Sequence, residues 1–285
     1  MANIIDTIVP FSYIRDKKQN IYIVRVIDSN KQKIFAKLLY INDNGLYVKK
    51  KATKLEEYYK YHKWISHHEI DEVWSPLLID EITSKKHFIL KKLYQLSYDN
   101  DVDLFLIGSR LIGLDNSNSD WDFLVKCHNP MFFYKQILQY VPDIRKYNQN
   151  ELFERAKRYS IPNSLYSLEV LFTLFKQTCT YTKYGNMDIG LFFIKSFQNQ
   201  WIESTIFVDS IMHCSVITKL SDSYSMPRII AVRTMNGCIL NILYTDWLLY
   251  GLENYQNNKQ IDFFNLWKVN DKLFVLDNEK GYVKF

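Results

Sequence analysis

Strand-like alternation of apolar and polar positions dominates the beginning of the chain. The segments IYIVRVID (21–28), KIFAKLLYI (33–41) and GLYVKK (45–50) are rich in β-branched and aromatic residues, which favours strands. Short polar runs separate them, and Asn44-Gly45 is a strong hairpin signal. The pattern predicts an N-terminal β-rich segment over residues 1–60, with a polar, aromatic linker at about 51–70.

The middle of the chain changes to helical spacing. Ser75-Pro76 predicts a helix start, because serine caps helices and proline fits the first helical position. An apolar stripe follows at helical spacing, made of Ile79, Ile82, Ile89, Leu90, Leu93 and Leu96. Beyond it the pattern predicts strands at 103–107 and 121–126, a helix from Asn129-Pro130, helices near 150–159 and 164–178, and a strand entered through Gly185-Asn186. These elements define a predicted core over residues 70–204.

The end of the chain returns to strand-like segments. STIFVDSIM, PRIIAVRT, CILNILYTDW, IDFFNLW and KLFVLDN follow one another from residue 204 onward, and Asn236-Gly237 predicts a hairpin between two of them. This predicts a C-terminal β-rich domain over 205–285. The two β-rich ends either form two small barrels or combine in one β-module.

One stretch of the middle, LFLIGSRLIGLDNSNSDWDFLVK (104–126), carries the candidate chemistry. Asp120 and Asp122 stand at the root of a strand, where alternation places both side chains on one face. Two carboxylates so close are unfavourable unless a cation offsets them, and Mg²⁺ binds through such oxygens together with substrate phosphates. Gly108 lets the backbone approach a phosphate, Ser109 offers a hydroxyl and an amide, and Arg110 either adds positive charge or is a surface residue.

The order of these residues resembles a known signature. Gly-Ser, a spacer of about ten residues and then Asp-x-Asp before apolar residues is similar to the motif of the DNA polymerase beta-type nucleotidyltransferase superfamily. The resemblance covers approximately residues 75–200 and neither β-rich end. It implies an α+β fold, in which a nucleotidyltransferase-like mixed β-sheet is flanked by helices and carries the β-rich N- and C-terminal extensions.

The resemblance also implies a third carboxylate on a later central strand. Asp188 is the best position, because it opens the apolar strand NMDIGLFFI just after helices. The alternative interpretation is that Asp188 only caps the turn after Gly185. Glu169, in a helical pattern, and Asp209, farther downstream, are the other acidic candidates.

The implied activity is a transfer of a nucleoside monophosphate from a nucleoside triphosphate, with ATP the first choice, to a hydroxyl, with release of pyrophosphate. Two Mg²⁺ ions, or Mn²⁺ in their place, would be held by Asp120, Asp122 and Asp188, with Asp188 on the ion that activates the attacking hydroxyl. A protein or small-molecule acceptor ranks ahead of RNA, and a second nucleotide stays open. The alternative function is a non-catalytic nucleotide-sensing or antitoxin-like binding module.

Composition and charge exclude only some classes of function and cellular location. A net charge of +5 over 285 residues suits an anionic ligand and falls short of the dense positive charge of a dedicated nucleic-acid binder. The four cysteines (Cys127, Cys179, Cys214 and Cys238) are scattered without a CxxC pair, which argues against a zinc ribbon or redox couple. With neither a signal-peptide pattern nor a long apolar run visible, the sequence predicts a cytoplasmic enzyme that does not enter a membrane.

Several polar groups allow two interpretations, and in each case the sequence favours the structural one. The basic run Lys49-Lys50-Lys51 with Lys54 is interpreted as a solvated turn rather than a phosphate patch. On the helix near 150–159, the charged residues Arg155, Lys157 and Arg158 are interpreted as a solvated face rather than as contacts to the triphosphate or acceptor. Arg228 and Arg233 are interpreted as part of an amphipathic sheet rather than of an acceptor-binding surface. A polar linker is favoured over a metal site for His62, His67 and His68.

Overall fold

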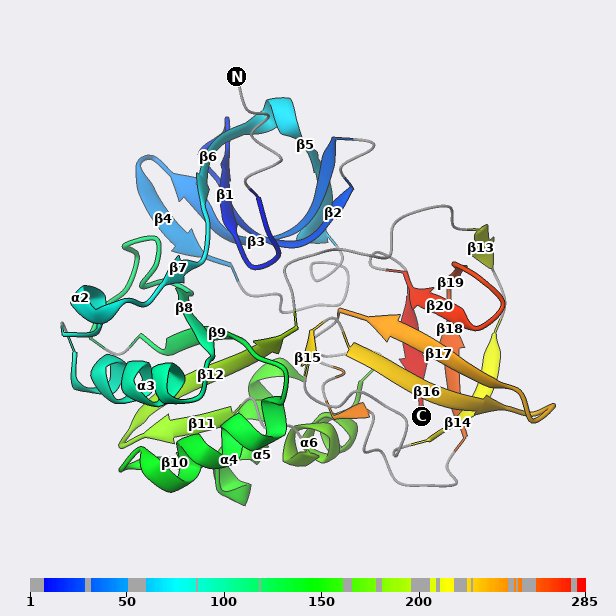
Figure 1. Ribbon diagram of the computed structural model, residues 1–285. Coiled ribbons are helices and arrows are strands. Elements are labelled where there is room, and N and C mark those ends of the chain that lie inside the picture. The colour runs from blue at the N-terminus through cyan, green and yellow to red at the C-terminus, as the bar shows by residue number, and fades with distance from the viewer. Residues whose placement is uncertain are drawn as a thin grey trace.

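The computed structural model (Figure 1) shows strands as the main component of the chain. Of the residues described, about 45% lie in strands and about 24% in helices, and the strands assemble into three sheets. The described residues are 8–28, 32–50, 60–85, 87–117, 119–160, 166–177, 181–195, 206–208, 211–217, 225–226, 228–245, 249, 251–252, 260–277 and 281–285.

The first sheet comes from the N-terminal part of the chain and curves into a half-barrel (Figure 1). Its strands are β1 (Tyr13–Asp16), β2 (Ile21–Asp28), β3 (Lys33–Asp43), β4 (Leu46–Lys49), β5 (His62–Ser66) and β6 (Ile70–Trp74). They follow the order β4-β3-β2-β1-β6, and β5 also pairs with β3. The predicted linker at about 51–70 is therefore wrong from residue 62 onward, because Ile65 and Ile70 are apolar anchors of this sheet's core.

The second sheet lies in the middle of the chain. It contains β7 (Leu77–Leu78), β8 (Asp103–Ile107), β9 (Trp121–Lys126), β10 (Ile144–Lys146), β11 (Tyr181–Tyr184) and β12 (Met187–Ile194) in the order β10-β11-β12-β9-β8-β7, and β15 (Ser225–Met226) pairs with β12. The neighbours β9 and β12 run parallel, whereas β8 is antiparallel to β9. The beginnings of β9 and β12 therefore meet at one edge of the sheet.

Five α-helices accompany the second sheet within the described residues: α2 (Glu81–Ser84), α3 (Phe88–Asp99), α4 (Pro130–Tyr140), α5 (Gln149–Tyr159) and α6 (Leu168–Gln177). Asn129 caps α4 as predicted. The helix start expected at Ser75-Pro76 is wrong, because β7 follows at once and the caps are Asp80 for α2 and His87 for α3. No helix in the described ranges is long and apolar enough to cross a membrane.

The third sheet is built from the C-terminal part of the chain. Its strands are β13 (Ile206–Val208), β14 (Met212–Val216), β16 (Arg228–Thr234), β17 (Ile239–Tyr244), β18 (Ile261–Phe264), β19 (Leu266–Lys268), β20 (Leu273–Leu276) and β21 (Tyr282–Lys284). The predicted hairpin at Asn236-Gly237 joins β16 to β17. The two β-rich ends form separate sheets that touch, since Val26 and Phe35 of the first pack against Leu243 and Val275 of the third.

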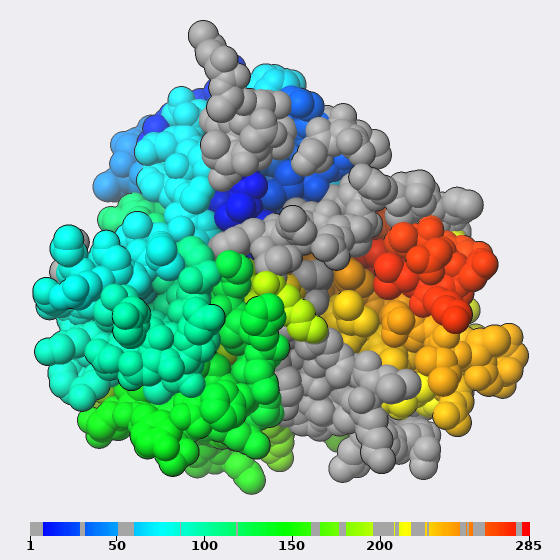
Figure 2. All heavy atoms as spheres, in the orientation of Figure 1, coloured from blue at the N-terminus to red at the C-terminus, as the bar shows by residue number. Residues whose placement is uncertain are grey.

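The cores explain how the sheets are joined. One core lies between the second sheet and the helices α3 and α4. A larger core covers the opposite face of that sheet and collects residues from α5, α6 and both other sheets, including Tyr13 and Tyr40 of the first sheet and Ile242 and Phe263 of the third. In Figure 2 the blue first sheet lies at the top, the green middle of the chain at the lower left, and the orange and red third sheet at the right.

The predicted fold class is therefore wrong. A helix-flanked α+β nucleotidyltransferase-like core with β-rich extensions does not describe a chain that is mostly β and divided among three sheets. The physical reason lies in the larger core, where the two terminal sheets bury apolar residues against the second sheet instead of extending away from it. The motif that suggested the fold covers a short stretch and carries no information about those sheets.

Candidate functional site

The three predicted aspartates meet where β9 and β12 begin. In the parallel pair, Trp121 lies beside Ile189 and Asp122 beside Gly190, so continuing the register by one residue brings Asp120 beside Asp188. Adjacent strands are about 4.8 Å apart, and residues two apart share a face. Asp120, Asp122 and Asp188 therefore occupy the same face at one edge of the second sheet.

Two glycines surround the Asp122 carboxylate. A Cβ built on Gly108, which has a φ of +83°, would lie 2.6 Å from Asp122 Oδ2. A Cβ on Gly190, the residue beside Asp122 on β12, would overlap Asp122 Oδ1. A side chain at either position would displace the carboxylate, so the two glycines provide the space in which it lies.

Electrostatic strain is concentrated in Asp122 of β9 and in Asp120 directly before it. Burial, and after it the negative charge of Asp120, raises the pKa of Asp122 to about 7. Asp120 is exposed as a residue, yet burial of its carboxyl and the charge of Asp188 raise its pKa as well. Both carboxylates would gain from a cation placed between them.

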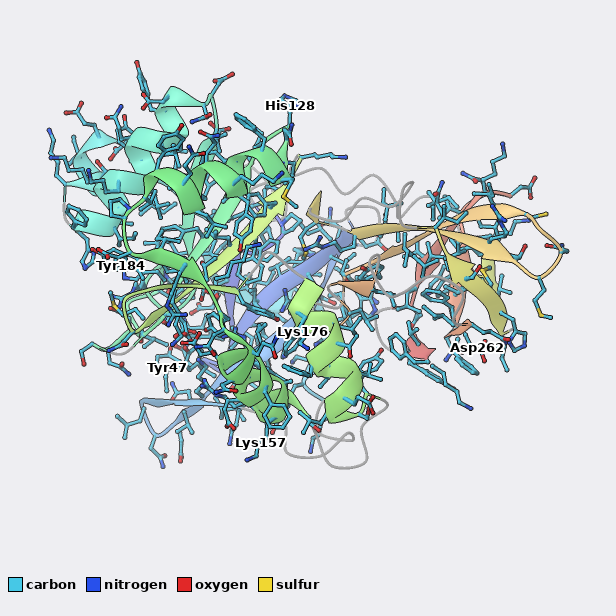
Figure 3. The ribbon with its side chains drawn as sticks, turned by 90° about the horizontal axis from the view of Figure 1, so that it is seen from below. Tyr47, His128, Lys157, Lys176, Tyr184 and Asp262 are labelled. Carbon is cyan, nitrogen blue, oxygen red and sulfur yellow. The ribbon has the colours of Figure 1, made fainter. Side chains whose placement is uncertain are left out.

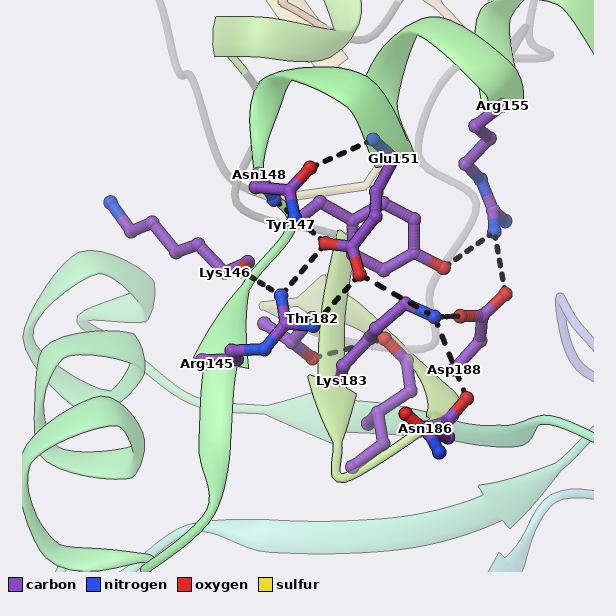
Figure 4. Close-up of polar contacts among 11 residues, drawn as sticks. Arg145, Lys146, Tyr147, Asn148, Glu151, Arg155, Thr182, Lys183, Asn186 and Asp188 are labelled. Carbon is purple, nitrogen blue, oxygen red and sulfur yellow. Dashed lines mark hydrogen bonds and ion pairs between the residues drawn. The ribbon is translucent and has the colours of Figure 1, made fainter.

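Asp188 is already neutralised by side chains of the chain itself (Figure 4). Lys183 Nζ lies 3.1 Å from Asp188 Oδ1, and Arg155 Nη1 lies 3.6 Å from Oδ2. The same Arg155 nitrogen donates to the Tyr147 hydroxyl at 3.2 Å, while Lys183 also lies 3.8 Å from Glu151. Asp188 is thus the negative centre of a polar network that joins β12 to β11 and α5.

Arg155 is held in an aromatic enclosure. Its guanidinium carbon lies 4.3 Å from the ring centre of Tyr181, 5.7 Å from that of Tyr147 and 5.6 Å from that of Tyr159. The side chain is only 16% exposed. The prediction of a solvated helix face is therefore wrong for Arg155, because Tyr181 from β11 covers it together with the nearby Tyr147 and Tyr159. Lys157 and Arg158 are exposed.

Arg110 fastens the loop between β8 and β9. Its guanidinium donates to the Asp120 carbonyl oxygen at 3.2 Å, to the Ser119 carbonyl oxygen at 2.7 Å and to Asp115 Oδ2 at 3.0 Å. It also lies 4.1 Å from the ring centre of Trp121. Arg110 thereby positions the residue that carries the first carboxylate. Ser109 follows Gly108 at the start of the same loop, and phosphate contact by either residue stays a prediction.

The N-terminal sheet reaches the carboxylates, which the sequence did not indicate. Tyr13 of β1 is buried, and its pKa is raised by burial and then by the charge of Asp122. The pKa of Tyr40, on β3, is raised by the same two causes. In the opposite direction, Lys49 of β4 lowers the pKa of Asp120 and that of Asp122. The site is therefore shared between the first and second sheets.

The donor set fits a divalent cation in part. Asp120 and Asp122 supply crowded carboxylate oxygens, the ligands that Mg²⁺ and Mn²⁺ prefer. In the part of the chain that the structure describes, however, no three acidic, histidine or cysteine side chains form a ready metal site, since Asp188 is turned to Lys183 and Arg155. The β9 pair is the part that fits, and Asp188 completes the set only by exchanging its present partners.

The remaining acidic candidates lie elsewhere. Glu169 is exposed on α6, and Asp209 lies outside the described residues.

The sequence analysis did not identify Gly190, Lys183 or Tyr13 as site residues. The sequence does contain a signal for Gly190, since a glycine within an apolar strand marks a close approach of another group to the backbone. It contains no signal for Lys183 or Tyr13, because their positions depend on strand pairing across distant segments.

Comparisons with protein-family models, with curated proteins and with solved structures found no match to this chain. The resemblance to a nucleotidyltransferase superfamily therefore rests on the residues of its motif alone.

Proposed function

We propose that the protein is a Mg²⁺-dependent nucleotidyltransferase, which transfers a nucleoside monophosphate from a nucleoside triphosphate to a hydroxyl. The observation that carries the proposal is the register of β9 and β12, with Asp120, Asp122 and Asp188 on one face. Gly108 and Gly190 support the proposal, because they leave space for the Asp122 carboxylate in a buried position. Burial raises the pKa of this carboxyl and makes its ionised form costly, and a purely structural role does not require such a cost.

In the proposed reaction, the acceptor oxygen forms a bond to the α-phosphorus while the bond from that phosphorus to the leaving pyrophosphate breaks. The acceptor hydroxyl gives its proton to solvent. Asp120 and Asp122 would hold the cation, joined by Asp188 when it leaves Lys183. When bound, Mg²⁺ neutralises the developing pyrophosphate and lowers the pKa of the acceptor hydroxyl.

The chain's own contribution is positioning and charge. Arg110 fixes the backbone of Asp120, so that the first carboxylate enters the reaction already oriented. Gly108, directly after β8, leaves the space in which the Asp122 carboxylate lies. Lys183 and Arg155 hold the Asp188 carboxylate at the site edge through ion pairs that a bound substrate complex can replace.

The test is labelling by the four α-³²P nucleoside triphosphates with Mg²⁺ and a cell lysate. The unchanged protein is expected to transfer label to a protein, small-molecule or RNA fraction, and the Asp120→Asn, Asp122→Asn double variant to transfer none. Asp99→Asn, at an exposed position on α3, is the matched control for the loss of a charge. Equal labelling by the unchanged protein and the double variant would overturn the site assignment.

A second candidate function is nucleotide sensing without turnover, as a binding module. It is favoured by one observation, that both charges facing Asp188 belong to the chain itself. Nucleotide binding without pyrophosphate release, together with stoichiometric capture of a partner protein, would favour this candidate over the enzyme.

A further inference from the structure

The cations around the three aspartates divide into two groups. Arg110 forms hydrogen bonds within its own loop, and Arg155 and Lys183 form ion pairs with Asp188. By contrast, neither Lys49 nor Arg158 makes an ion pair within 4.0 Å with any residue that the structure describes. Their charges are available to a ligand.

The register of the first sheet places Lys49 toward the site. Ile21 lies opposite Tyr40, and Tyr40 lies opposite Lys49, and directly opposite residues of antiparallel strands share a face. Tyr40 and Ile21 on this face belong to the large core that also contains Ile107, the last residue of β8. Lys49 therefore extends the face that covers the site, at the free edge of the sheet.

The helix α5 places Arg158 toward the same carboxylates. Residues three apart on a helix are neighbours on its surface, and Arg158 follows Arg155, whose guanidinium faces Asp188, by three positions. Lys157, directly before Arg158 in the last turn, lies at the outer side of α5 (Figure 3).

We propose that Lys49 and Arg158 bind the terminal phosphates of the substrate triphosphate, so that the N-terminal sheet and α5 together complete the site. Lysine and arginine are the side chains that clamp polyphosphates in proteins. Neither residue forms an ion pair with the carboxylates, and the strand register and the helical spacing place both on the faces that border the site. This inference rests on the proposed function, since it names the residues that hold its substrate.

The lysine run at 49–51 is thereby interpreted differently from the sequence-based prediction of a solvated turn. Lys49 shares the face of Tyr40, whereas Lys51 and Lys54 lie outside the described residues. Its neighbour Lys50 lies on the alternate face and donates its backbone N–H to the Leu39 carbonyl oxygen. Lys50 is the matched control for Lys49, as Lys157 is for Arg158.

The experiment measures binding of inorganic tripolyphosphate with Mg²⁺ by isothermal titration calorimetry, because this probe does not depend on the base or on catalysis. Lys49→Ala and Arg158→Ala are each expected to weaken binding roughly ten- to a hundredfold, the usual effect of losing a hydrogen bond between charged groups. Lys50→Ala and Lys157→Ala are expected to bind like the unchanged protein, and Lys49→Arg to retain most of the affinity. Circular dichroism of each variant verifies its fold.

The results that would overturn the inference differ from a failure of the proposed function. Equal affinities of Lys49→Ala and Lys50→Ala would remove Lys49 from the substrate site, and equal affinities of Arg158→Ala and Lys157→Ala would remove Arg158. Absence of tripolyphosphate binding by the unchanged protein would remove both. If label transfer from α-³²P triphosphates persists in that case, the proposed function stands without this inference. If transfer also fails, both are overturned.

Discussion

The substitution Asp122→Asn offers a direct measure of the strain at the site. In the protein without a divalent cation, burial and the charge of Asp120 raise the pKa of Asp122 from 3.8 to about 7. Between about pH 4 and pH 7 the folded protein therefore holds a proton that the unfolded chain has released, and stability falls as the pH rises through this range. Above pH 7 the cost is complete and constant.

The magnitude follows from the two pKa values. The interval between 3.8 and about 7 corresponds to about 4 kcal/mol, at about 1.4 kcal/mol per pH unit. Because the residue is only partly buried, solvent screening reduces this figure, and we expect about 2 kcal/mol. For a chain of this size that is a shift of roughly 5 °C in the midpoint of thermal unfolding.

The assay is thermal unfolding followed by circular dichroism in EDTA, from pH 4 to pH 8. Asp122→Asn is expected to unfold at a higher temperature than the unchanged protein at pH 8 and at the same temperature at pH 4. The control Asp99→Asn removes an equal charge from an exposed position and should leave the pH profile unchanged. If the unchanged protein and Asp122→Asn show parallel profiles over the whole range, the carboxylate is not strained and the reasoning is refuted.

Three further substitutions test the surroundings of the carboxylates. Gly190→Ala should lower the free energy of unfolding in urea by about 1–3 kcal/mol, since its Cβ would overlap Asp122. Adding Asp122→Ala should recover most of that loss. If the effects of the two substitutions on the free energy of unfolding are strictly additive, the clash is contradicted. Arg110→Ala removes three hydrogen bonds from the loop before β9, so amide hydrogen exchange over 111–120 should accelerate at least about tenfold; an unchanged rate would show that Arg110 does not hold the loop. Arg155→Gln should cost about 3 kcal/mol by leaving Asp188 with one cation, with part of it restored by Asp188→Asn, and no restoration would mean that the two side chains are not coupled.

The sequence predicted local elements well where the signal was itself local. The strands at 103–107 and 121–126 and the helix beginning after Asn129 agree with β8, β9 and α4, because apolar alternation and an asparagine cap act within a few residues. Ser75-Pro76 failed for the opposite reason. Leu77 and Leu78 pair with β8, and a partner strand overrides a local helix signal.

The candidate site was predictable only in part, because most of its residues are brought together by contacts between distant segments. Asp120 and Asp122 lie on one strand, so their shared face follows from alternation alone. The placement of Asp188 beside Asp120 depends on parallel pairing of β9 with β12, which no local pattern specifies. Arg155 on α5 is covered by Tyr181 of the distant strand β11. The terminal sheets join the core through contacts that the short motif does not contain.

The central claim is that the acids of β9 and β12 take up divalent cations together with a triphosphate. Electron paramagnetic resonance of Mn²⁺, titrated into the protein with saturating tripolyphosphate, measures this most directly. The account predicts that the unchanged protein with tripolyphosphate binds Mn²⁺ more tightly than tripolyphosphate alone does. The Asp120→Asn, Asp122→Asn double variant is predicted to lose this additional binding. Identical Mn²⁺ titrations for the two proteins would contradict it.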